Sequence, residues 1–195
     1  AVRVCLNINS TKTTNNYYVQ DDAARLLDPT SQAMVEDKRV IKNNFRGITL
    51  GYVMNRGYER VRGFYGGQII YNYNRIRTSY QYGNLMTPEN PNPSTNLWGR
   101  VASRLLEQDN GITRTIGMGL IAGVEYYFLP KVCIGGEATL QYNYAWGTQS
   151  NQKTEQIVGG DLVEMDKVLS PGDRNSVLNT IRPATYGGLY LMFNF

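Results

Sequence analysis

The stretch KVCIGGEATLQYNYAW, from Lys131 to Trp146, alternates two kinds of side chain along its whole length. Its even-numbered positions, from Val132 to Trp146, are mostly apolar or aromatic, and its odd-numbered positions are small or polar. Successive side chains of a β-strand point to opposite faces of a sheet, so the pattern predicts one strand with an apolar and a polar face. A usual strand has about 5 to 6 residues, whereas a run this long is typical of a tilted strand that crosses a membrane and extends beyond it.

The same alternation recurs in other parts of the chain. TRTIGMGLIAGVEYYF, from Thr113 to Phe128, precedes this strand, and Leu129-Pro130 joins the two as a tight hairpin. Further alternating segments are Ala1 to Asn9, Phe45 to Arg56, Val61 to Arg77 and the last residues, ATYGGLYLMFNF, from Ala184 to Phe195. The chain is therefore predicted to be all-β, with six strands.

The predicted connections between these strands alternate in length. Short turns are expected at about residues 57–60 and 129–130, and long loops at about 10–44, 78–112 and 147–183. Transmembrane β-barrels have short periplasmic turns, long extracellular loops and aromatic girdles at both interfaces. We therefore predict that residues 1–195 form one domain, a transmembrane antiparallel up-and-down β-barrel.

Composition limits the other classes of protein. No apolar run approaches the roughly 20 residues of a membrane-spanning helix, and a net charge of +4 without a Lys/Arg run argues against a nucleic-acid partner. A lipocalin-like soluble barrel, with its apolar side chains inside, fits the same alternation. The polar face carries Gly, Thr, Asn and Gln instead of a Lys/Glu mixture, and aromatic residues gather at strand ends, which favours lipid outside the barrel.

Three segments together resemble a known family. They are GYERVRGFYGGQIIYNYNRIRTSYQYGN (Gly57 to Asn84), IGMGLIAGVEYYFLPKVCIGGEATLQY (Ile116 to Tyr142) and the ending YGGLYLMFNF. They are similar to the small outer-membrane β-barrels of Bacteroidetes-type, Gram-negative bacteria. The resemblance implies integral insertion in the bacterial outer membrane by the barrel-assembly machinery, which would read a signal in the last strand at Leu191, Phe193 and Phe195.

Such barrels have an even number of strands, at least about eight, so we expect eight strands here. The two strands beyond the six lie either in an upstream hairpin outside this chain, which we favour, or in Asn16 to Leu27 and Ala33 to Lys42, where the alternation is poor.

The sequence offers little chemistry for an enzyme. It contains no histidine, which removes the His-dependent barrel enzymes and His-type zinc sites, so we expect no catalytic activity, no metal and no cofactor. Cys5 and Cys133 both fall on the polar face, which predicts either a disulfide across the interior or two buried thiols.

Charged residues suggest two further sites. Glu125 and Glu137 fall on the polar face and form either an acid/base pair or, as we favour, a structural network with Arg3. An eight-stranded barrel is just wide enough for its own side chains, so we expect a filled lumen. Five arginines where strands enter the long loops form either a rim for lipopolysaccharide phosphates or ordinary interfacial anchors: Arg46, Arg75, Arg77, Arg114 and Arg182.

The functional expectation is a non-catalytic structural or interaction protein. We expect an accessory subunit of a larger outer-membrane complex for barrel assembly, export or uptake, in contact with lipids, lipopolysaccharide and other outer-membrane proteins or lipoproteins. The alternative is a small channel or a barrel that binds a ligand or lipopolysaccharide. Asn96 to Gln108 is also predicted as a short amphipathic helix on the rim, against a partner or over the barrel mouth.

Overall fold

The computed structural model describes residues 1–96, 103–129, 132–169, 180–184 and 190–193, the last two ranges as backbone only. These residues form a nine-stranded sheet and one short helix, α1 (Asp22–Leu27). The strands are β1 (Val2–Gln20), β2 (Met34–Tyr58), β3 (Val61–Gln81), β4 (Arg104–Leu129), β5 (Val132–Gly147), β6 (Ser150–Val158), β7 (Asp161–Leu169), β8 (Thr180–Ala184) and β9 (Tyr190–Phe193). The predicted all-β class is confirmed.

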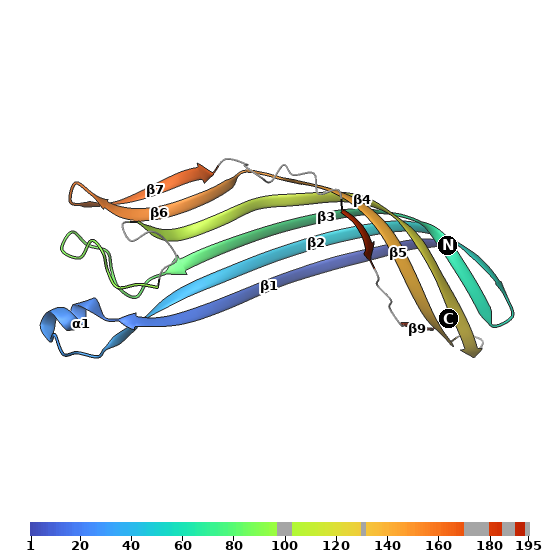
Figure 1. Ribbon diagram of the computed structural model, residues 1–195, viewed down its shortest axis with the longest axis horizontal. Helices are drawn as coiled ribbons and strands as arrows, with labels where there is room; N and C mark the ends of the chain where they lie inside the picture. Colours follow the sequence, from blue (N-terminus) through green and yellow to red (C-terminus); the bar gives the residue numbers. More distant parts are fainter. Residues whose placement is uncertain (97–102, 130–131, 170–179, 185–189, 194–195) are drawn as a thin grey trace.

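Every strand pair is antiparallel, and the main path across the sheet is β1-β2-β3-β4-β5-β8. β9 pairs with the first residues of β5, while the β6–β7 hairpin pairs with the first residues of β4. Figure 1 shows a long sheet that bends strongly at the end holding both termini, with α1 and the β6–β7 hairpin at the other end. Among the described residues β1 pairs only with β2, so the sheet is open there and not a closed barrel.

Strand structure extends into all three stretches predicted as long loops. β1 continues to Gln20 and β2 begins at Met34, so most of 10–44 is a paired hairpin, and the stretches 78–112 and 147–183 also contain strand residues. Polar residues such as those around Thr13 pair through backbone hydrogen bonds, which require no apolar alternation. The helix expected at 96–108 is likewise corrected in part, because β4 begins at Arg104, while residues 97–102 lie outside the described part.

The short connections agree with the chain positions predicted for them. Tyr58 pairs with Val61 across a turn in which Glu59 has a φ of 54°. Leu129 pairs with Val132, so β4 and β5 form a hairpin around residues 130–131, which are outside the described part.

The sheet curves around a face rich in glycine and polar residues. On this concave face a Cβ added at Gly66 would lie 2.0 Å from the backbone O of Tyr52, so the close approach requires a glycine. A small apolar cluster of Val53, Phe64 and Ile121 is buried on the same face, with exposed fractions of 3 to 6%. Small residues here leave room for the long polar side chains of neighbouring strands.

Hydrogen bonds fix the segments at the end distant from the termini. The Asp37 carboxylate is fully buried and accepts from Gly83 N, Thr95 Oγ1 and Asn96 N at 2.7 to 2.9 Å. Asn84 Nδ2 donates to Gln20 O. Residues 82–96 are therefore attached to the ends of β1 and β2 as an ordered structure.

Candidate functional site

The most unusual feature of the molecule is an exposed apolar face on the convex side of the sheet. Register aligns its side chains in rows across five strands, for example Val4, Leu50, Ile69, Met118 and Tyr142. Met118 is 65% exposed and Leu120 is 67% exposed. Soluble monomers rarely expose a contiguous apolar surface of more than a few hundred Å². We call the rows on this side of the sheet, at the level of Ile116 to Phe128 of β4, the apolar face. Their exposure indicates an apolar environment or partner.

The height of the apolar face is similar to the thickness of the hydrocarbon layer of a bilayer. Its positions in β4 run from Ile116 to Phe128. At about 3.3 Å per residue these span about 40 Å of strand, or about 28 Å along the normal for a tilt of about 45°. The hydrocarbon layer of a bilayer is about 25 to 30 Å thick.

Basic and aromatic residues border the apolar face on the side toward α1. One row contains Ile8, Arg46, Tyr73, Arg114 and Trp146. The rings of Tyr144 and Trp146 are 5.7 Å apart. This row thus mixes basic and aromatic residues beside the apolar rows. Aromatic and basic residues are also enriched at membrane interfaces.

Arg75 and Arg77 lie one and two rows further out, where they bind acidic partners. Both form ion pairs with Asp109, and Arg77 also pairs with Glu107 at 3.1 Å. Hydrogen bonding from the Arg75 guanidinium, with a smaller contribution from Arg77, lowers the pKa of Asp109 to about 2. These two arginines are therefore partly neutralised within the protein.

The fifth predicted rim residue occupies another position. Arg182 in β8 pairs with Gln141, whose row contains Gly119 and Gln68, and it does not share a row with Arg46 or Arg114. β8 begins beside Asn143, so Arg182 lies deeper in the sheet than the loop assignment implied and at a different level from Arg46 and Arg114.

Asp109 gives a testable pH dependence. Its folded pKa lies below the ordinary 3.8, so its contribution to stability is present above about pH 4 and is lost as the pH falls toward about 2. We expect Asp109→Asn to lower the free energy of unfolding at pH 7 by about 1 kcal/mol, because solvent screens both arginines. Urea unfolding in detergent at pH 7 and pH 2 should show a much smaller difference at pH 2, where about half of the Asp109 carboxyl is protonated. The exposed Asp161→Asn is the control, and an equal loss there at pH 7 would contradict the assignment.

The concave face brings together two of the three residues predicted to form a network. Arg3 Nη1 of β1 donates to Glu137 Oε2 of β5 at 2.9 Å, although three strands separate β1 and β5. Glu125 instead accepts from Tyr127 Oη at 2.9 Å. Arg3 and Glu137 both line a hollow of about 370 Å³, whose lining is polar and apolar in similar proportion.

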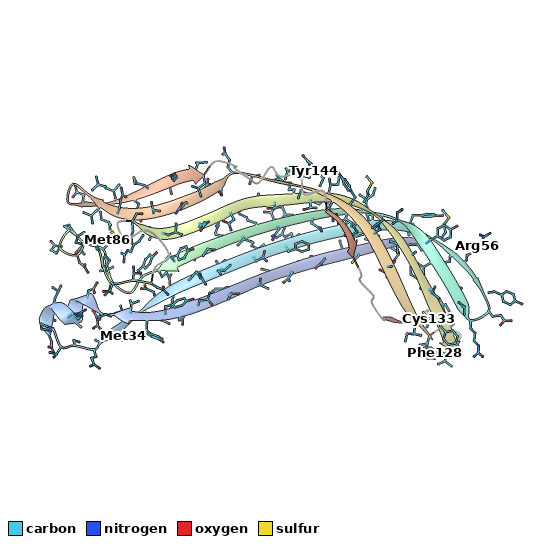
Figure 2. All side chains as sticks on the ribbon, in the orientation of Figure 1. Met34, Arg56, Met86, Phe128, Cys133 and Tyr144 are labelled. Atoms are coloured by element: carbon cyan, nitrogen blue, oxygen red, sulfur yellow. The ribbon has the colours of Figure 1, made fainter. Side chains whose placement is uncertain are left out.

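Cys5 and Cys133 are free thiols in the structure, so the disulfide alternative is not realised. Cys5 pairs in register with Thr49, whereas Cys133 pairs with Tyr127 near the β4–β5 turn. The two cysteines lie at different levels of the sheet, because β1 starts with Ala1 beside Val53, well above the β2–β3 turn. Cys133 is fully buried and Cys5 is exposed, so the second alternative holds for Cys133 only. Figure 2 shows Cys133 near Phe128 at the bent end.

A buried ion pair was not predicted from the sequence. It lies at the end of the sheet distant from the termini, which contains α1, β6 and β7 and which we call the distal part. Arg104 Nη2 lies 2.7 Å from Glu155 Oε1, with exposed side-chain fractions of 6% and 11%. Arg104 Nη1 also donates to Asn84 O at 2.6 Å, and its guanidinium lies 4.5 Å from the centroid of the Tyr82 ring. No local pattern reveals this site, because its members come from distant segments of the chain.

The predicted assembly signal is described only in part. β9 places Leu191 opposite Ile134 and Phe193 opposite Val132, in rows that belong to the apolar face. Phe195 lies outside the described residues.

No helix in the described part of the chain is long and apolar enough to cross a membrane. No family model, no curated protein and no solved structure matches the chain.

Proposed function

We propose that this chain forms the wall of an integral outer-membrane β-barrel and acts as a non-catalytic structural or interaction protein. The observation that carries the proposal is the apolar face, which is exposed on five neighbouring strands over about 28 Å. Lipid would cover this face, and the basic and aromatic row would lie at the level of the head groups.

Insertion requires that the open edges be paired. An unpaired strand edge in hydrocarbon leaves backbone groups without partners, at several kcal/mol each. β1 runs opposite to β8 and β9, since each step along the path is antiparallel. The two edges therefore close either directly or through an even number of added strands.

The Arg3–Glu137 ion pair favours a narrow barrel. Extended Arg and Glu side chains joined at 2.9 Å hold their Cα atoms within about 15 Å. Strands about 4.8 Å apart and tilted by about 40° place strands four positions apart at about 16 Å in an eight-stranded barrel, which is close to this reach. In a twelve-stranded barrel the same strands are about 21 Å apart, well beyond it. We therefore propose eight strands with a filled lumen, in which one added hairpin joins β1 to β8 and β9.

The part of the sheet beyond the apolar face suits an interaction role. β6 and β7 continue beside β4, and buried polar groups such as Asp37 hold the neighbouring segments in place. An ordered extension of this kind provides a fixed surface for a partner outside the membrane. The proposed role is an accessory subunit of an outer-membrane complex for barrel assembly, export or uptake, in line with the resemblance to small barrels of Bacteroidetes-type bacteria.

Extraction of the native outer membrane tests the proposal. The chain should remain in the pellet after alkaline carbonate treatment and change its gel mobility on heating, as a folded barrel does. Native gels of a mild-detergent extract, followed by mass spectrometry, should place it at a fixed ratio with a larger barrel or a lipoprotein. Release by carbonate would contradict insertion, and migration alone would contradict the subunit role.

A small channel or ligand-binding barrel is the alternative, and the hollow on the concave face favours it. Polar side chains such as Gln68 and Gln141 line this hollow. Steady single-channel steps in planar bilayers would support a channel and contradict a filled lumen.

A further inference from the structure

We propose that a basic strip on the convex face binds the phosphate group of a phosphorylated lipid whose acyl chains lie against the apolar face. The strip consists of Lys12, Lys42, Arg46 and Arg114. The inference rests on the proposed function, because it requires that lipid cover the apolar face. It adds a specific ligand class to that surface.

Two basic residues of the strip lie directly opposite each other on neighbouring strands, and a bound anion would relieve the repulsion between them. Lys12 and Lys42 are direct cross-strand partners, and Arg77 follows Lys42 in the same row. Directly opposed residues of an antiparallel pair lie about 4.5 to 5.5 Å apart, and like charges there destabilise the sheet. A phosphate between the two ammonium groups would convert this repulsion into two charge-assisted hydrogen bonds.

The four residues also have unused charge. None of the ion pairs formed within the described part of the chain includes any of them. Arg75 and Arg77 lie in the same region but bind Asp109 and Glu107, so they contribute less to an external anion. Lys12, Lys42 and Arg46 are exposed, and Arg114 is half-buried.

The position of the strip indicates a lipid and not a soluble phosphate. Arg46 and Arg114 belong to the row next to the one containing Ile48 and Ile116 of the apolar face. Lys42 is four residues beyond Arg46 on β2, about 13 Å along the strand and about 9 Å along the normal of a tilted strand. Basic side chains thus cover the depth of the head groups directly beside the acyl chains, where each contributes to attraction of anionic lipid.

Native mass spectrometry in detergent micelles tests the inference. The probes are phosphatidic acid and phosphatidylcholine with identical acyl chains, supplied in equal amounts. We expect the protein to retain phosphatidic acid over phosphatidylcholine by about tenfold, and Lys12→Gln with Lys42→Gln to reduce the preference several-fold. Adding Arg46→Gln and Arg114→Gln should bring the ratio close to one.

The control replaces Arg25 and Lys167, two exposed basic residues of the distal part, with Gln and should leave the preference unchanged. An unchanged preference in the strip variants would overturn the inference, as would full displacement of phosphatidic acid by excess inorganic phosphate, which would indicate a site for soluble anions. Heat-dependent gel mobility separates the two proposals. A variant that inserts with an unchanged preference contradicts only the strip, whereas a native chain that does not insert contradicts both.

Discussion

Replacing Leu120 with Arg should block membrane insertion of most of the protein. Leu120 is 67% exposed and lies in a row with Val2, Tyr52 and Leu140, near the middle of the apolar face. A basic side chain on the lipid face near the bilayer midplane costs about 2 to 4 kcal/mol. On a sheet surrounded by water, the same replacement of an exposed Leu would be nearly neutral. The two environments therefore predict different results for one substitution.

Refolding into phosphatidylcholine vesicles measures this effect. The fraction of protein that shows heat-dependent mobility should fall sharply for Leu120→Arg. Val168→Arg is the matched control, because Val168 is 59% exposed but lies on β7, beyond the basic border. It should insert like the native protein. Equal insertion of native protein and Leu120→Arg would show that lipid does not cover the apolar face.

The sequence was most informative where one physical pattern acts alone. In Lys131 to Trp146 the side chains alternate with period two, and this alternation correctly separates the concave from the convex face. The turn near Glu59 and the connection between Leu129 and Val132 were located because they interrupt the same period. Lipid outside the apolar face stays a prediction, because alternation places apolar side chains on one face whichever medium covers that face.

Other features depend on register, which no single strand specifies. The strands continue through polar stretches such as Thr11 to Asn16, where the hydrophobic signal is absent and backbone pairing alone is sufficient. Cys5 and Cys133 share a face but lie at different heights, since β1 pairs with β2 starting at Ala1 and Val53. Pairing of Arg3 with Glu137 was predictable only as two opposite charges on one face, and the curvature of the sheet brings them together.

Replacing Arg104 with Met should destabilise the distal part of the sheet by about 3 to 5 kcal/mol, because the change leaves the Glu155 carboxylate buried without its partner. The substitution also removes the donor to Asn84 O and the cation over the Tyr82 ring. The apolar face would be intact, so the loss should be local. Limited proteolysis in detergent should then cut within residues 82–96, while the heat-dependent mobility of the protein stays native.

Two further variants separate loss of the ion pair from loss of packing. Arg104→Met combined with Glu155→Leu removes both charges and should recover much of the protease resistance, since apolar residues of similar volume often replace a buried pair at little cost. Lys153→Met breaks the solvent-exposed pair with Glu164 and should change the cleavage rate little. If the double variant were as sensitive as Arg104→Met, the contacts of Arg104 with Asn84 and Tyr82 would be the main source of stability. If Arg104→Met were as resistant as the native protein, the distal part would not depend on this ion pair, and its order would have to come from Asp37 and the backbone pairing of β4 with β6.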